Sequence, residues 1–143
     1  MKEIGIYVHI PFCKSKCYYC DFNSFTNKGE YIEKYVKCLK KEIKNVGDRV
    51  RRNSNGNYAE LSIAKTLYIG GGTPSFIDAK YIEQIMDTIQ TNFEIDKNIE
   101  ATIEVNPGTV TLKKLQKYRE IGINRLSIGL QTSNDNLLKL IGR

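Results

Sequence analysis

The sequence contains no long, uninterrupted apolar segment. Its first apolar run, at residues 4–10, is broken by Gly5 and His9 and leads directly into Pro11. This pattern predicts neither a secretory signal peptide nor a membrane span. Low-complexity segments are also missing, and the composition of 41% hydrophobic and 27% charged residues over 143 positions is typical of one globular domain. We therefore expect a cytoplasmic protein.

Signals for nucleic-acid binding are also lacking, although the net charge is +6. Residues 34–52 hold eight basic residues against Glu42 and Asp48, so this stretch carries the whole net charge. It has neither the interleaved aromatic residues nor the motifs of nucleic-acid-binding proteins. We interpret it as a solvated helix face. If it docks a partner, an acidic electron-transfer protein fits better than nucleic acid.

Strand-like and helix-like patterns alternate four times along the chain. Strands are expected at residues 4–10, 66–69, 101–105 and 125–130, and helices at 31–45, 78–91, 111–121 and 134–141. Asp78 is placed to cap the second helix, and Gly47 and Gly122 to end the first and third. Residues 51–57 are expected to form an exposed loop. The alternation predicts βα units around a parallel sheet.

Four βα units are too few to close a barrel. A closed eight-unit barrel takes about 250 residues, so this chain predicts only an arc of a TIM-like barrel. We expect residues 1–143 to be the N-terminal portion of a larger domain, with the rest of the barrel absent. A solitary arc of this kind is expected to be marginally stable, or to pair the free edge of its fourth strand with a second copy of the chain.

Three of the four cysteines lie within eight residues. Cys13, Cys17 and Cys20 follow the first predicted strand with C-x3-C-x2-C spacing. Because no export signal favours disulfides, the pattern indicates metal or redox chemistry. A four-iron cluster normally takes four thiolates, so three would leave one iron open. The alternative is a zinc site completed by His9, in a zinc-stabilised interaction module. Cys38, alone on the flank of the first helix, is interpreted as a filler residue.

Other unusual residues also follow the strands, where parallel α/β folds carry their chemistry. Gly71, Gly72 and Thr73 follow the second strand without the residues of a phosphate loop or a dinucleotide fingerprint. Their bare backbone can approach a ligand closely. Glu104 closes the third strand on its polar face, where a cation, a hydroxyl or a barrel residue such as Arg125 is the expected partner.

The sequences YVHIPFC at residues 7–13 and CYYCDFN at 17–23 strongly resemble the radical S-adenosylmethionine superfamily. The likeness continues through residues 70–75, 104–109, 124–131 and 142–143. Within the superfamily the chain looks most like the HemW family of haem chaperones, relatives of the oxygen-independent coproporphyrinogen III oxidases. The oxidase branch resembles Cys-x-x-Cys-x-Cys here, whereas Phe22 follows Asp21 in this chain. This departure favours the chaperone over the oxidase.

The resemblance implies a [4Fe–4S] cluster on Cys13, Cys17 and Cys20, whose open iron binds S-adenosylmethionine. One electron from the reduced cluster would then cleave the sulfonium bond and yield a 5′-deoxyadenosyl radical. The resemblance also implies haem or a porphyrin as a further ligand. It further implies that the rest of the barrel and a C-terminal domain are absent from residues 1–143, and that this chain alone has weak or absent activity. The implied contacts to S-adenosylmethionine are Tyr7, the backbone at Tyr19, Gly71, Gly72, Thr73, Glu104, Gln131 and Arg143.

Overall fold

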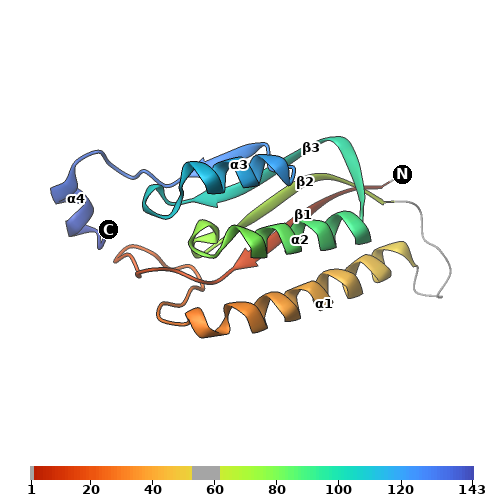
Figure 1. The fold of residues 1–143 in the computed structure, drawn as a ribbon, viewed down its shortest axis with the longest axis horizontal. Helices are drawn as coiled ribbons and strands as arrows, with labels where there is room; N and C mark the ends of the chain where they lie inside the picture. The colour runs from red at the N-terminus through yellow and green to blue at the C-terminus, as the bar shows by residue number, and fades with distance from the viewer. Residues whose placement is uncertain (1, 53–61) are drawn as a thin grey trace.

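The computed structural model describes residues 2–52 and 62–143, and it contains one parallel sheet with the strand order β1-β2-β3-β4 (Figure 1). The strands are β1 (Lys2–Ile10), β2 (Ser62–Gly71), β3 (Glu94–Val105) and β4 (Arg125–Ile128). The helices are α1 (Ile32–Arg51), α2 (Ala79–Asn92), α3 (Leu112–Glu120) and α4 (Asp135–Leu140). Three short 3-10 turns precede α1, α2 and α3, at Gly29–Tyr31, Pro74–Phe76 and Pro107–Thr109. The predicted four βα units are confirmed.

One face of the sheet is apolar and lies under α1, α2 and α3 (Figure 1). Val8, Ile69 and Ile103 stand side by side across three strands, and all three are buried. Because side chains alternate between the faces of a strand, this register turns one full set of apolar residues towards the helices. Helix α2 lies in the middle and packs Ile82 and Ile85 into the same core.

The other face of the sheet is polar. Tyr7 pairs with Tyr68, Tyr68 with Thr102, and Thr102 with Arg125, so these four residues form one row across the sheet. In a closed barrel this face would line the interior. The open sheet with helices on one side is therefore the predicted arc of a barrel.

The end of α1 differs from the prediction. Gly47 was expected to end the helix, but it lies buried inside α1, which continues to Arg51. A Cβ atom at this position would lie 2.7 Å from the backbone oxygen of Asn92, so the glycine allows α1 to pack closely against the end of α2. Of the predicted loop at residues 51–57, Arg51 belongs to α1 and residues 53–57 lie outside the described residues.

The other predicted helix boundaries hold. The Asp78 side chain accepts a hydrogen bond from the backbone of Lys80 and caps α2, and Gly122 follows α3 with a φ of +97°. Strands β2 and β3 begin earlier than expected, because Ile63 and Ala64 already pair with β3. A register shift follows, where Lys65 and Asp96 form an ion pair of 2.7 Å. Within the described residues, no helix has the length and apolar character needed to cross a membrane.

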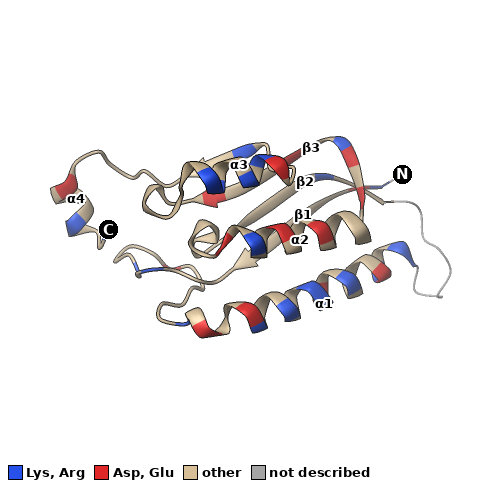
Figure 2. Cartoon of the chain, viewed as in Figure 1, with Lys and Arg blue, Asp and Glu red and all other residues tan. Residues whose placement is uncertain are grey.

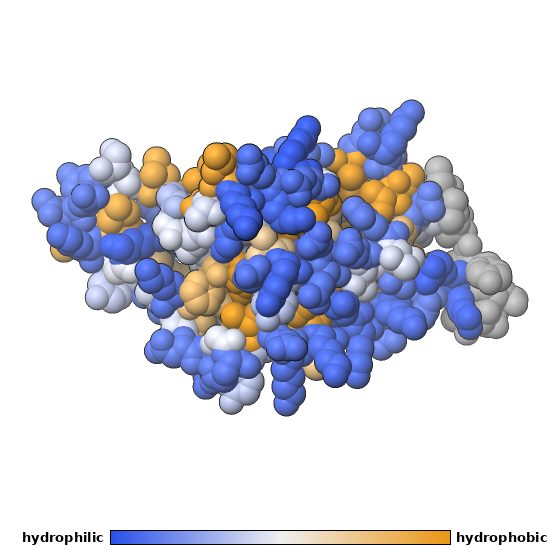
Figure 3. All heavy atoms as spheres, viewed as in Figure 1, coloured by the Kyte–Doolittle hydropathy of each residue, from blue (hydrophilic) through white to orange (hydrophobic). Residues whose placement is uncertain are grey.

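The basic stretch at residues 34–52 lies along α1. Figure 2 shows the Lys and Arg positions spread over the length of this helix, and Figure 3 shows a largely hydrophilic surface on the same side of the molecule. Four of these side chains, Lys37, Lys40, Lys41 and Lys44, line a groove of about 590 Å³ between α1 and α2. The stretch is therefore a solvated helix face, as predicted, and it borders a groove that the sequence did not reveal.

Candidate functional site

The cysteine loop, residues 13–25, is closed at its base by a short backbone pairing. The Phe25 amide donates to the Pro11 oxygen at 2.7 Å, and the Cys13 amide donates to the Phe25 oxygen at 3.0 Å. Phe12, between them, is buried in the core. Within the loop, the Cys20 amide donates to the Cys17 oxygen at 3.1 Å and forms a turn. The loop is therefore anchored at the end of β1 while its tip extends outwards.

The three loop cysteines are free thiols. Cys13 is buried at the base of the loop, whereas Cys17 and Cys20 are half-buried. Tyr19 lies beside Cys17 and Cys20. Burial raises the pKa of the Tyr19 hydroxyl, and the two cysteines raise it further, whereas the Arg143 guanidinium acts in the opposite direction. Three soft thiol donors on one accessible loop fit an iron–sulfur cluster.

The zinc alternative does not fit the geometry. Both ring nitrogens of His9 have partners: Tyr7 Oη lies 2.9 Å from Nδ1, and the Asn23 oxygen lies 2.9 Å from Nε2. Since a carbonyl oxygen only accepts, Nε2 carries the proton and Nδ1 accepts from Tyr7. Across residues 2–52 and 62–143, no three His, Cys, Asp or Glu side chains are arranged around a single metal ion, and this holds for the three loop cysteines as well. His9 is a structural residue that ties β1 to the end of the cysteine loop.

The glycine loop after β2 packs directly against the cysteine loop. The Gly72 amide donates to the Ile10 oxygen and the Thr73 amide to the Phe12 oxygen, each at 2.9 Å. A Cβ atom on Gly72 would lie 2.9 Å from Cys13 Sγ, and the Thr73 hydroxyl lies 3.5 Å from the same sulfur. Two motifs that are about sixty residues apart in sequence therefore meet at one thiol.

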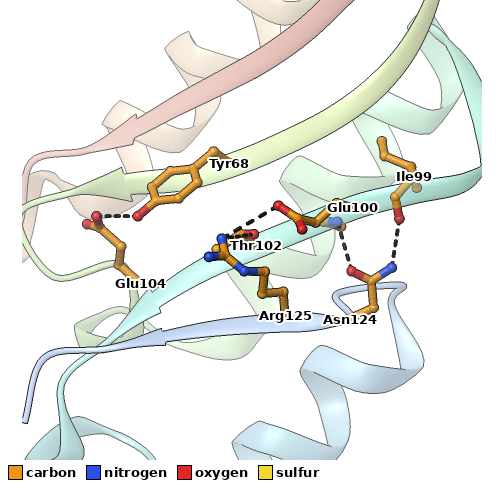
Figure 4. A network of polar contacts seen from close by, with 8 residues as sticks. Tyr68, Ile99, Glu100, Thr102, Glu104, Asn124 and Arg125 are labelled. Atoms are coloured by element: carbon orange, nitrogen blue, oxygen red, sulfur yellow. Dashed lines mark hydrogen bonds and ion pairs between the residues drawn. The ribbon is translucent and has the colours of Figure 1, made fainter.

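Glu104 at the end of β3 holds the first part of the same glycine loop. Its Oε1 accepts from the Tyr68 hydroxyl at 2.8 Å, and its Oε2 accepts from the Gly71 amide at 3.1 Å. Figure 4 shows the Tyr68 ring reaching from β2 to this carboxylate. The hydroxyl partner was therefore correctly predicted, whereas Arg125 interacts instead with Glu100 and Thr102.

Gln131 and Arg143 lie at the end of β4 and after α4. Gln131 has a left-handed backbone with a φ of +65°, and the Arg143 guanidinium donates to the Gly129 oxygen. The Tyr18 amide donates to the Ile141 oxygen at 3.1 Å, so α4 lies beside the cysteine loop, as Figure 1 also shows. Residues from the ends of all four strands thus meet at one edge of the sheet, which we call the rim.

Two residues of this network were missed by the sequence analysis. Tyr68 could have been found, because it alternates with buried Leu67 and Ile69 in the same way as Glu104 alternates with its neighbours. For Lys114, no pattern among the neighbouring residues of the sequence indicated its role. Its Nζ donates to the Ser75, Ile77 and Thr109 oxygens at 2.7, 3.0 and 3.2 Å, and burial lowers its pKa. It thereby joins the segments that follow β2 and β3.

Comparison with known proteins identifies the family. The radical SAM superfamily model matches residues 7–143. Proteins named "Heme chaperone HemW" from Buchnera aphidicola subsp. Schizaphis graminum and Escherichia coli are 40% and 37% identical over the whole chain, which spans 36% of their length. A solved structure of coproporphyrinogen III oxidase (HemN) from Escherichia coli matches with a TM-score of 0.85 and 31% identity, over 99% of this chain and 31% of that one. The cysteine loop, the parallel arc and these matches agree: the chain belongs to the radical SAM superfamily.

Proposed function

We propose that this chain binds a [4Fe–4S] cluster through Cys13, Cys17 and Cys20, and S-adenosylmethionine along the adjoining rim. Membership of the superfamily implies both cofactors. The observation that carries the residue assignment is the contact between the Cys13 thiol and the glycine loop at Gly72 and Thr73. When bound and reduced, the cluster supplies the electron that cleaves the sulfonium bond of S-adenosylmethionine.

The chain's own residues bind and orient the cofactor in this proposal. Gly71, Gly72 and Thr73 would line the methionine end, and Glu104 holds the backbone of Gly71. Tyr7 and the backbone at Tyr19 would contact the nucleoside. Gln131 and Arg143 would complete the polar contacts from the end of β4 and the chain after α4.

Anaerobic reconstitution with iron and sulfide tests the cluster ligands. We expect about four irons and four sulfides per chain, and loss of most of this iron in Cys13→Ser, Cys17→Ser and Cys20→Ser. Ser15→Ala, an exposed change within the same loop, is the control and should retain the iron. One zinc and no iron would instead support the interaction module and refute the proposal.

We further infer that the chain is the N-terminal portion of the core domain of a cytoplasmic haem chaperone of the HemW type. The support is the higher identity to proteins of that name, 40% and 37%, than to the coproporphyrinogen oxidase, 31%. A longer protein containing these residues is expected to bind and transfer haem and not to turn over coproporphyrinogen. Coproporphyrinogen turnover without haem transfer would favour the oxidase, and the chain alone should show weak or no radical activity.

The groove between α1 and α2 is proposed to receive an acidic electron-transfer protein. It is lined by five lysines, the four from α1 and Lys80 from α2, and Glu33 is the only acidic residue in its lining. Charge complementarity of this kind mainly raises the association rate. Replacing Lys40 and Lys41 by Glu should slow reduction of the cluster by an acidic donor, while reduction by dithionite stays unchanged. Equal rates with the donor would refute the docking.

A further inference from the structure

We propose that a second groove, on the outer flank of α1, binds haem with the Cys38 thiolate as an axial ligand of the iron. This inference rests on the proposed function as a haem chaperone and assigns the place on this chain at which the haem would sit. The groove has a volume of about 450 Å³ and lies on the side of α1 that faces away from α2. It is therefore separate from the rim and from the lysine groove.

The walls of this haem groove are aromatic. Phe12 and Phe25 come from the base of the cysteine loop, while Tyr31 ends the 3-10 turn before α1 and Tyr35 lies in the first turn of α1. The Tyr35 hydroxyl donates to the His9 oxygen at 2.6 Å, and its ring meets Phe12 edge to face at 5.4 Å. Tyr35 therefore forms a rigid floor that is tied to β1.

Two of the walls are apolar surfaces that the fold leaves uncovered. Phe25 is 51% exposed and Tyr31 is 49% exposed, although both are large hydrophobic residues. Neighbouring exposed aromatic side chains of this size mark a binding surface more often than an ordinary exterior. A flat apolar ligand placed between them would remove this area from water.

The charges around the haem groove select an anionic ligand. Lys28 and Lys34 line it, and no acidic residue does. The Lys28 ammonium lies over the Tyr31 ring at 5.5 Å from its centre, at the margin of the aromatic surface. Haem combines a flat apolar macrocycle with two carboxylates, so its body matches the aromatic walls and its propionates match the two ammonium groups.

Cys38 adds the iron ligand. It is a free, exposed thiol that lines the same groove, one helical turn after Lys34 and Tyr35. Cysteine thiolate is an established axial ligand of haem iron. On binding to ferric haem the thiol would release its proton to solvent. The groove is open on one side and leaves one edge of the macrocycle exposed, as passing haem to an acceptor requires.

The test is a titration with ferric haem after the cluster has been reconstituted, so that Cys13, Cys17 and Cys20 are not available as ligands. We expect one haem per chain with the electron paramagnetic resonance signature of ferric thiolate ligation. Cys38→Ser should lose this signature and bind about tenfold more weakly. Lys28→Gln with Lys34→Gln should weaken binding about threefold to tenfold, as expected for two exposed ion pairs.

A double variant with the same loss of charge is the control. Lys97→Gln with Lys113→Gln changes exposed residues of β3 and α3 and should leave haem affinity unchanged. Haem binding that is insensitive to the Cys38 and Lys28/Lys34 changes would overturn the haem groove while leaving the proposed function intact. Failure of the unchanged chain to bind haem would also overturn the haem groove, whereas haem transfer by the longer protein tests the proposed function separately. A dimer that Tyr31→Ala dissociates, with no effect on haem binding, would assign the groove to a second copy instead.

Discussion

The carboxylate of Glu104 lies between the hydroxyl of Tyr68 and the backbone amide of Gly71, at 2.8 and 3.1 Å. A residue at the end of β3 therefore fixes the last residue of β2, with a tyrosine of β2 as its second partner. This arrangement leaves both carboxylate oxygens engaged and holds the glycine loop at a set distance from the polar face of the sheet.

Tyr68→Phe removes one of these two hydrogen bonds and keeps the ring. We expect S-adenosylmethionine to bind the reconstituted chain about fivefold more weakly, which corresponds to one net hydrogen bond of about 1 kcal/mol. Calorimetric titration measures this change. Tyr81→Phe, on α2, removes a hydroxyl away from the rim and should bind normally. Equal affinities for both variants would show that the Glu104 contact does not position the cofactor.

Gly72→Ala tests the close approach of the glycine loop to the cysteine loop. The new methyl group would lie 2.9 Å from Cys13 Sγ and 3.0 Å from the Phe12 oxygen, and the second of these atoms belongs to the backbone. Relieving such overpacking costs about 1–3 kcal/mol and displaces the thiol, so we expect most of the reconstituted iron to be lost.

Gly29→Ala is the matched control for this change. A Cβ atom at Gly29 meets nothing within 4 Å, so its iron content should equal that of the unchanged chain. Iron and sulfide analysis after identical reconstitution compares the two variants. Full iron in Gly72→Ala would mean that the two loops separate without consequence for the cluster.

The Lys65–Asp96 ion pair makes the stability dependent on pH at the acid end. Hydrogen bonds from the Lys65 side chain and the Asn98 amide lower the pKa of Asp96 below its ordinary value of 3.8. A carboxyl whose pKa is lowered by folding adds stability above its unfolded value, and this stability is lost as the pH falls through the folded value. Urea unfolding of Asp96→Asn should therefore show a smaller loss of stability between about pH 5 and pH 3. Asp87→Asn, on α2, should keep the full dependence.

The edge of β4 is expected to pair with a second copy of the chain. Leu126, Ile128 and Leu130 are 39%, 60% and 58% exposed at this edge, and parallel strands are normally covered. Light scattering should show a concentration-dependent dimer. Ile128→Lys should shift the chain to monomer, because a charge on an edge strand disfavours pairing. A chain that is monomeric at all concentrations would refute this prediction.

The sequence by itself determined the features that depend on near neighbours along the chain. The spacing of Cys13, Cys17 and Cys20 and the alternation of Ile103, Glu104 and Val105 are local patterns, and they are sufficient to indicate the cysteine loop and the polar face of the sheet. Asp78 and Gly122 behaved as expected for the same reason, because capping involves only the first or last turn of a helix.

Only the tertiary structure decided the features that join distant segments. A glycine at position 47 predicts the end of a helix when only its neighbours in the sequence are considered, yet packing against Asn92 keeps it inside α1. The register places Tyr68 and Arg125 on either side of Thr102, and only their side chains decide the partner of Glu104: Tyr68 reaches Glu104, whereas Arg125 reaches Glu100. The aromatic groove beside Cys38 forms where the base of the cysteine loop meets α1. Such contacts arise from packing in three dimensions, which no local period of the sequence encodes.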